Sequence, residues 1–193
     1  MHPSGRMILA FYANGMIRLW NLLDARCIFK KKVGMSEDEE SDEEEYDSED
    51  EPKEKKVEPE YKVNNKFLNM PISVKWETTE GKFYAVLFGM LLEVFSVEDD
   101  GEAPLHSVKF DTAQTSFAFI STTSLVVSDI KGRLTLFTNL GDVENVQMRI
   151  TETESKKIKV VTSSPDQTFF VSIADDHISL WNSEDFTAAD EAD

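Results

Sequence analysis

The segment with the clearest capacity for chemistry is an acidic run at residues 36–60, SEDEESDEEEYDSEDEPKEKKVEPE, with fifteen Asp or Glu and three Lys. A dense block of negative charge attracts basic partners at long range. We predict that this run is a partner-binding acidic arm. The residues expected to carry the binding are Glu37, Asp38, Glu39, Glu40, Asp42, Glu43, Glu44 and Glu45. A solvated surface loop without a function is the alternative interpretation.

Three serines lie within the acidic run and could accept phosphate. Ser36, Ser41 and Ser48 are each followed by acidic residues, which is the context that kinases of the casein kinase 2 type prefer. Phosphorylation would add further negative charge to the arm. Because the run has few aliphatic or aromatic residues, it cannot bury enough surface to order itself, and we expect a disordered insertion.

Other reactive residue types lack the spacing that catalysis or metal binding needs. His2, His106 and His177 are not spaced as metal ligands, and Cys27 is the only cysteine. The sequence contains no phosphate-binding loop, nucleophile elbow, zinc-protease or kinase motif. We therefore expect no enzyme, no cofactor, no metal and no small-molecule substrate, and the lack of an 18-residue apolar stretch predicts no membrane partner.

Outside the acidic run the charge is nearly balanced, with 22 acidic against 17 basic residues. That balance argues against a nucleic-acid-binding domain with a basic face. The run Lys30–Lys32 could contact RNA phosphates, but a solvated edge strand that discourages pairing is the interpretation we favour.

An internal repeat organises the rest of the chain. Residues 2–22, 76–97, 120–140 and 163–183 each combine a polar turn, an apolar strand, a tight turn and an alternating strand that closes on an aromatic residue. The closing aromatics are Trp20, Phe95, Phe137 and Trp181, at spacings of 75, 42 and 44 residues. The last two spacings match the length of about 40–45 residues for a four-stranded propeller blade. If the acidic run is an insertion, the first spacing without it also approaches this blade length.

Turn residues and alternating runs predict an all-β fold. Asn14-Gly15, Lys131-Gly132 and Asp175-Asp176 stand at equivalent tight turns, and Asn-Gly is a strong hairpin signal. Apolar–polar alternation over short runs is typical of half-buried strands, and no segment has the period of an amphipathic helix. Further strands are predicted at 26–33, 72–76, 105–110, 115–120, 146–150 and 157–161.

These residues resemble the WD40 repeat family of β-propellers. Trp20-Asn21 and Trp181-Asn182 stand where the family has Trp-Asp, and Asn14 and Asp175 match its turn aspartate. The middle two units are degenerate, with Phe95 and Phe137 in place of Trp and with Gly89 and Lys131 at the aspartate position. The family's hydrogen-bonded tetrad is incomplete in every unit. The resemblance implies WD40-type four-stranded blades and a protein-binding scaffold.

Within that family, the first thirty residues resemble a nucleolar subfamily that acts in ribosome assembly. The residues that carry this resemblance are His2-Pro3-Ser4-Gly5, Leu19-Trp20-Asn21-Leu22, Arg26 and Phe29-Lys30-Lys31. The resemblance implies a scaffold in biogenesis of the large (60S) ribosomal subunit, in the nucleus and nucleolus, with pre-60S components as partners. The alternatives are a negative regulator that binds a p21-activated protein kinase, another nuclear WD40 adaptor, and an enzyme with a pocket on a propeller face.

The repeat also predicts how the chain divides into domains. We expect a partial blade at 1–34, the acidic insertion at 35–63, blades at 64–110 and 111–156, a partial blade at 157–185, and an acidic tail at 186–193. Three and a half to four blades are fewer than the usual seven, so we expect the C-terminal part of a seven-bladed propeller. A half-propeller completed by a partner chain and a four-bladed ring are the alternatives.

Overall fold

The computed structural model of the 193-residue chain describes residues 1–12, 16–32, 71–97, 103–153 and 157–188. Throughout these ranges the regular elements are β-strands, without a helix, and fourteen strands form four separate antiparallel sheets. The prediction of an all-β fold is therefore confirmed. The six additional strands expected from the sequence are also confirmed, each within two residues at its ends.

Each sheet is a simple meander in which neighbours in sequence are neighbours in the sheet. The first sheet contains β1 (Met7–Phe11), β2 (Met16–Asn21) and β3 (Arg26–Lys32). The second contains β4 (Pro71–Trp76), β5 (Phe83–Phe88), β6 (Leu91–Ser96) and β7 (His106–Lys109). The third contains β8 (Gln114–Ser121), β9 (Ser124–Asp129), β10 (Arg133–Thr138) and β11 (Gln147–Glu152). The fourth contains β12 (Ile158–Ser163), β13 (Phe169–Ala174) and β14 (Ile178–Asn182).

The four closing aromatics occupy the same position in equivalent strands. Trp20 in β2, Phe95 in β6, Phe137 in β10 and Trp181 in β14 are each the penultimate residue of their strand. When the four sheets are aligned on these strands, each end sheet lacks one strand among the described residues. The first sheet lacks the strand equivalent to β4 and β8, and the fourth lacks a named strand equivalent to β7 and β11. The sheets are thus four versions of one unit, with three strands at each end of the series and four in the middle.

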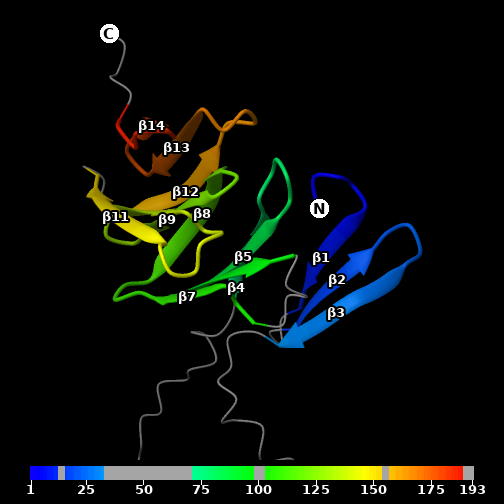
Figure 1. Cartoon of the computed structure of the whole chain (residues 1–193). Helices are drawn as coiled ribbons and strands as arrows, with labels where there is room; N and C mark the ends of the chain where they lie inside the picture. Colours follow the sequence, from blue (N-terminus) through cyan, green and yellow to red (C-terminus); the bar gives the residue numbers. More distant parts are fainter. Residues whose placement is uncertain (13–15, 33–70, 98–102, 154–156, 189–193) are drawn as a thin grey trace, which may run out of the picture.

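The sheets pack face to face in chain order. Figure 1 shows them as a series from the blue first sheet, at the right, to the orange and red strands of the fourth, at the upper left. Three apolar clusters fill the spaces between successive sheets, and each draws side chains from two neighbouring sheets. Because alternate residues of a strand point to opposite faces, one strand can serve two clusters. In β5, for example, Phe83, Ala85 and Leu87 join the third sheet, whereas Tyr84, Val86 and Phe88 join the first.

The first strands of the second, third and fourth sheets lie side by side. Strand β8 contacts β4 on one side and β12 on the other. The Val161 backbone N–H donates to the Ser116 hydroxyl at 3.1 Å, and the Lys75 ammonium donates to the Phe117 carbonyl. Burial lowers the pKa of Lys75, whose Nζ also lies 5.3 Å from the Phe117 ring centroid. Polar contacts therefore set the spacing of neighbouring sheets along this line.

Candidate interaction surfaces

In the second, third and fourth sheets the closing aromatic points toward the preceding sheet. Phe95 lies in the cluster shared with the first sheet, and Phe137 and Trp181 lie in the clusters shared with the second and third sheets respectively. Leu19 faces the second sheet, so strand alternation places the next residue, Trp20, on the opposite face. No described strand covers that face of the first sheet.

The side chains just before each closing aromatic point toward the next sheet along the chain. Three positions before the closing aromatic stand Ile17, Leu92, Leu134 and Ile178. The first three side chains are 0% exposed, whereas Ile178 is 64% exposed. Directly before the closing aromatic stand Leu19, Val94, Leu136 and Leu180. The first three side chains are 2%, 1% and 9% exposed, whereas Leu180 is 44% exposed. The same apolar positions are therefore covered by another sheet in three cases and bare in the fourth.

The bare side of the fourth sheet is a continuous apolar surface. Val160, Ile173 and Ile178 are directly opposite one another on adjacent strands, and Val171 stands opposite Leu180 in the next row. Val160 and Phe169 are also exposed. An exposed apolar surface of this kind marks an interaction site. We call it the Ile178 face.

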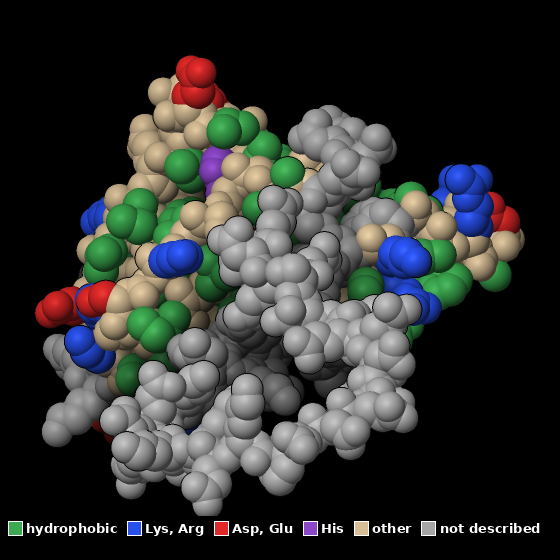
Figure 2. All heavy atoms as spheres, turned by 90° about the horizontal axis from the view of Figure 1, so that it is seen from below, with side chains coloured by type: hydrophobic (Ala, Val, Ile, Leu, Met, Phe, Trp, Pro, Cys, Tyr) green, Lys and Arg blue, Asp and Glu red, His purple; other side chains and the backbone are tan. Residues whose placement is uncertain are grey.

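The bare side of the first sheet differs in charge. Ile8 stands opposite Trp20, and in the next row Arg18 stands opposite Lys30. The Arg18 guanidinium lies 5.0 Å from the Tyr12 ring centroid, and Lys30 is exposed. Figure 2 shows basic side chains gathered at the right of the molecule, the end that the first sheet occupies. We call this surface the Trp20 face.

The structure describes only part of the predicted site. The acidic arm residues Glu37, Asp38, Glu39, Glu40, Asp42, Glu43, Glu44 and Glu45, the serines Ser36, Ser41 and Ser48, and the turn residue Asn14 all lie outside the described residues. Asp175 is exposed at the β13–β14 turn, where it forms an ion pair with Lys159. His177 closes the same turn by accepting, at its carbonyl, the backbone N–H of Ala174 at 3.0 Å.

The turn aspartate of the third sheet is Asp129, which was not predicted from the sequence. Its carboxylate accepts the backbone N–H groups of Lys131 and Arg133 at 2.9 Å, the Thr112 hydroxyl at 2.8 Å and the Arg133 Nε at 2.7 Å. Burial alone would raise the pKa of Asp129, but the bonds from Arg133, Thr112 and Lys131 hold it below its ordinary value. The signal was the run Asp129-Ile130-Lys131-Gly132, because an aspartate two residues before such a turn caps its backbone.

The segment His2–Gly5 forms a tight turn before the first sheet, and its His2 side chain packs against the second sheet. The Gly5 backbone N–H donates to the His2 carbonyl at 2.9 Å, and the His2 Nδ1 and Ser4 Oγ are 2.7 Å apart. The His2 ring packs edge-on against Trp76, with centroids 5.0 Å apart, and lies directly over Gly81. The residues that carry the subfamily resemblance thus make a contact between neighbouring sheets.

Trp181 combines its packing with a polar bond across its own sheet. The indole N–H donates to the Ser172 hydroxyl on β13 at 2.9 Å, and both residues are buried. The ring also stacks on Phe170 and Phe186, with centroid separations of 5.9 Å in each case. This bond fixes the orientation of the indole against the third sheet.

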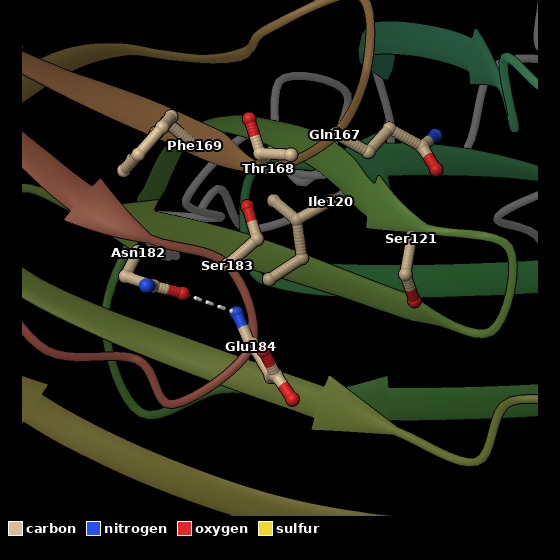
Figure 3. A pocket seen from close by; sticks show the side chains of 8 residues that line it. All are labelled: Ile120, Ser121, Gln167, Thr168, Phe169, Asn182, Ser183 and Glu184. Carbon is tan, nitrogen blue, oxygen red and sulfur yellow. Dashed lines mark hydrogen bonds between the residues drawn. The ribbon is translucent and has the colours of Figure 1, made fainter.

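A shallow pocket of about 440 Å³ opens where the third and fourth sheets meet. Figure 3 shows its lining, which comes from the end of β8, the β12–β13 turn with the start of β13, and the end of β14 with the segment after it. The lining residues are Ile120, Ser121, Gln167, Thr168, Phe169, Asn182, Ser183 and Glu184. Glu184 is the one ionisable side chain among these lining residues, and Ser121, Thr168 and Ser183 bring hydroxyl groups.

Metal-binding and membrane-spanning features are absent from the part of the chain that the structure describes. No three His, Cys, Asp or Glu side chains group there as a metal site, and no helix there could cross a bilayer. The chain matches no protein-family model and no curated protein.

Proposed function

We propose that the chain is a non-catalytic interaction scaffold built from WD40-type β-propeller blades, acting in assembly of the large ribosomal subunit in the nucleolus. The observation that carries the scaffold proposal is the repetition of one sheet and one closing aromatic four times, with the same face-to-face contact made three times between them. Such an array presents rigid loops and faces to partners. The non-catalytic part of the proposal rests on the sequence, which contains no catalytic motif.

In this proposal the four sheets are part of a closed ring. The Trp20 face and the Ile178 face lie at opposite ends of the series, so further blades would lie against both of them. Seven blades in total is the number expected from the WD40 resemblance. A β-propeller buries both faces of every blade, which is the reason for proposing that these two faces are not permanently exposed to water.

The assignment to ribosome assembly rests on the resemblance of the first thirty residues to the nucleolar subfamily. The acidic arm supplies the expected partner chemistry, because basic ribosomal proteins and assembly factors are attracted to a segment with fifteen carboxylates. In this proposal, a contact with ribosomal RNA would involve the exposed Lys30 on the edge strand β3.

Affinity purification followed by sedimentation tests this function. A tagged chain should co-migrate with precursors of the large subunit in the heavy fractions of a gradient. Recovery only in light fractions together with a protein kinase would contradict the proposal in favour of the kinase regulator. Recovery with nuclear complexes that lack ribosomal precursors would contradict it in favour of another nuclear adaptor.

A further inference from the structure

The molecule makes the same sheet-to-sheet contact three times. The Ile178 face and the Trp20 face correspond to the two sides of that contact. In every internal contact, a face with a closing aromatic meets the apolar face of the preceding sheet. The described chain leaves one face of each kind without a sheet against it. Since the same side-chain positions are involved, each open face has the shape and chemistry to receive the other.

The two faces cannot meet within one molecule. Figure 1 places the first and fourth sheets at opposite ends of the series, separated by the second and third. A contact between them therefore requires two copies of the chain. We infer that a second copy docks head to tail, with its Trp20 face against the Ile178 face of the first. The inference rests on the proposed scaffold, because the second copy takes the place that a neighbouring blade of the ring would take against that face.

Charge favours this arrangement over a symmetric contact of two Trp20 faces. The Trp20 face carries Arg18 opposite Lys30, whereas the Ile178 face is formed by apolar side chains. Over the whole segments, residues 1–32 carry six Lys or Arg and one Asp, and residues 157–188 carry five Asp or Glu and two Lys. Two Trp20 faces would bring like charges together, while a first sheet against a fourth brings a basic segment to an acidic one.

The energetic reason for the contact is the apolar surface that it removes from water. Ile178 and Leu180 occupy positions that are nearly fully buried in the other three sheets. Covering such side chains stabilises the contact in proportion to the apolar area buried. A head-to-tail contact of this kind closes a ring or continues as a chain of copies, depending on the rotation between copies.

Paired face variants test the inference by sedimentation velocity over a wide range of protein concentration. The variant Ile178→Asp with Leu180→Asp, and separately Trp20→Glu, should each weaken association by more than about tenfold, because each places a charge in an apolar contact. Ile150→Asp is the matched control, since Ile150 is 52% exposed on β11 and lies on neither face. Circular dichroism should show that all variants keep their strands.

Mixing the two variants identifies which faces meet. Each variant alone should remain monomeric, but an equimolar mixture should form a dimer, because the intact Trp20 face of one meets the intact Ile178 face of the other. A Trp20→Glu variant that still associates alone would overturn the inference in favour of a symmetric contact. A wild-type chain that stays monomeric at every concentration would overturn it as well, while leaving the ribosomal assignment to its own sedimentation test.

Discussion

Leu134 and Ile178 occupy the same position in successive sheets, yet Leu134 is 0% exposed and Ile178 is 64% exposed. The difference lies in the neighbouring sheet, since the fourth sheet covers Leu134 and no described strand covers Ile178. An apolar position that is buried in three sheets and exposed in the fourth is stronger evidence for an interaction surface than exposure alone, because the other three sheets show what covers that position.

The bond between Trp181 and Ser172 should contribute measurably to stability. Ser172→Ala leaves a buried indole N–H without its acceptor, so the free energy of unfolding should fall by about 1–2 kcal/mol. Urea denaturation followed by tryptophan fluorescence measures this change. Ser179→Ala is the control, because Ser179 stands opposite Ser172 on β14, and it should cost clearly less. Equal losses in the two variants would show that the bond is not the cause.

Gly81 should be intolerant of any side chain. Its φ is +71°, and an added Cβ would overlap the His2 imidazole at its Nε2. Gly81→Ala should lower the free energy of unfolding by more than about 1 kcal/mol, through both backbone strain and displacement of the His2 ring from Trp76.

The double variant His2→Ala with Gly81→Ala separates these two causes. Removing the imidazole should recover the steric part of the loss but not the part due to the positive φ. Thermal denaturation of wild type, the two single variants and the double variant gives the coupling in a double-mutant cycle. A coupling of zero would show that the His2 ring does not lie over Gly81 in solution.

The Arg133 contacts should make stability depend on pH in one direction. Asp129 and Asp111 both have pKa values below the ordinary 3.8, and the Arg133 side chain bonds both. A carboxyl with a lowered folded pKa stabilises the fold above its unfolded pKa and loses that contribution as pH falls through the folded value.

Arg133→Met removes a charged partner from the buried Asp129 carboxylate. The variant should therefore lower the free energy of unfolding by about 1–3 kcal/mol above about pH 5, with the gap closing on acidification below about pH 4. Urea denaturation of wild type and variant across this range gives the gap directly. A gap that stays constant to low pH would show that the loss arises from packing of the Arg133 stem and not from charge.

Deleting the acidic run should affect binding but not folding. Loss of residues 36–60 removes a net charge of −12, so binding to a basic test protein should weaken, and the difference should shrink as salt rises. A replacement of the same length in Ser and Gly is the control for linker length. A large fall in the thermal midpoint of either chain would contradict the expectation of a disordered insertion.

Much of the fold could be predicted because the repeat is visible in the residue pattern. The alternation around Trp20 and Trp181 and the turn at Asp175-Asp176 locate strands without any tertiary information. Asp129 was missed because the spacing rule pointed to Lys131, six positions before Phe137, while the capping carboxylate is two residues earlier. The surroundings of Ile178 depend on which sheet faces which, and a single strand's alternation does not specify the neighbour.

The described part of the chain repeats one sheet-to-sheet contact and leaves it incomplete at its two ends. Hydroxyl-radical footprinting of the dilute chain measures the accessibility of each side chain. We predict strong labelling of Ile178 and Leu180 with little labelling of Leu134 and Leu136, and loss of labelling at Ile178, Leu180 and Trp20 together as concentration rises. Equal labelling of Ile178 and Leu134 in the dilute chain would contradict the claim.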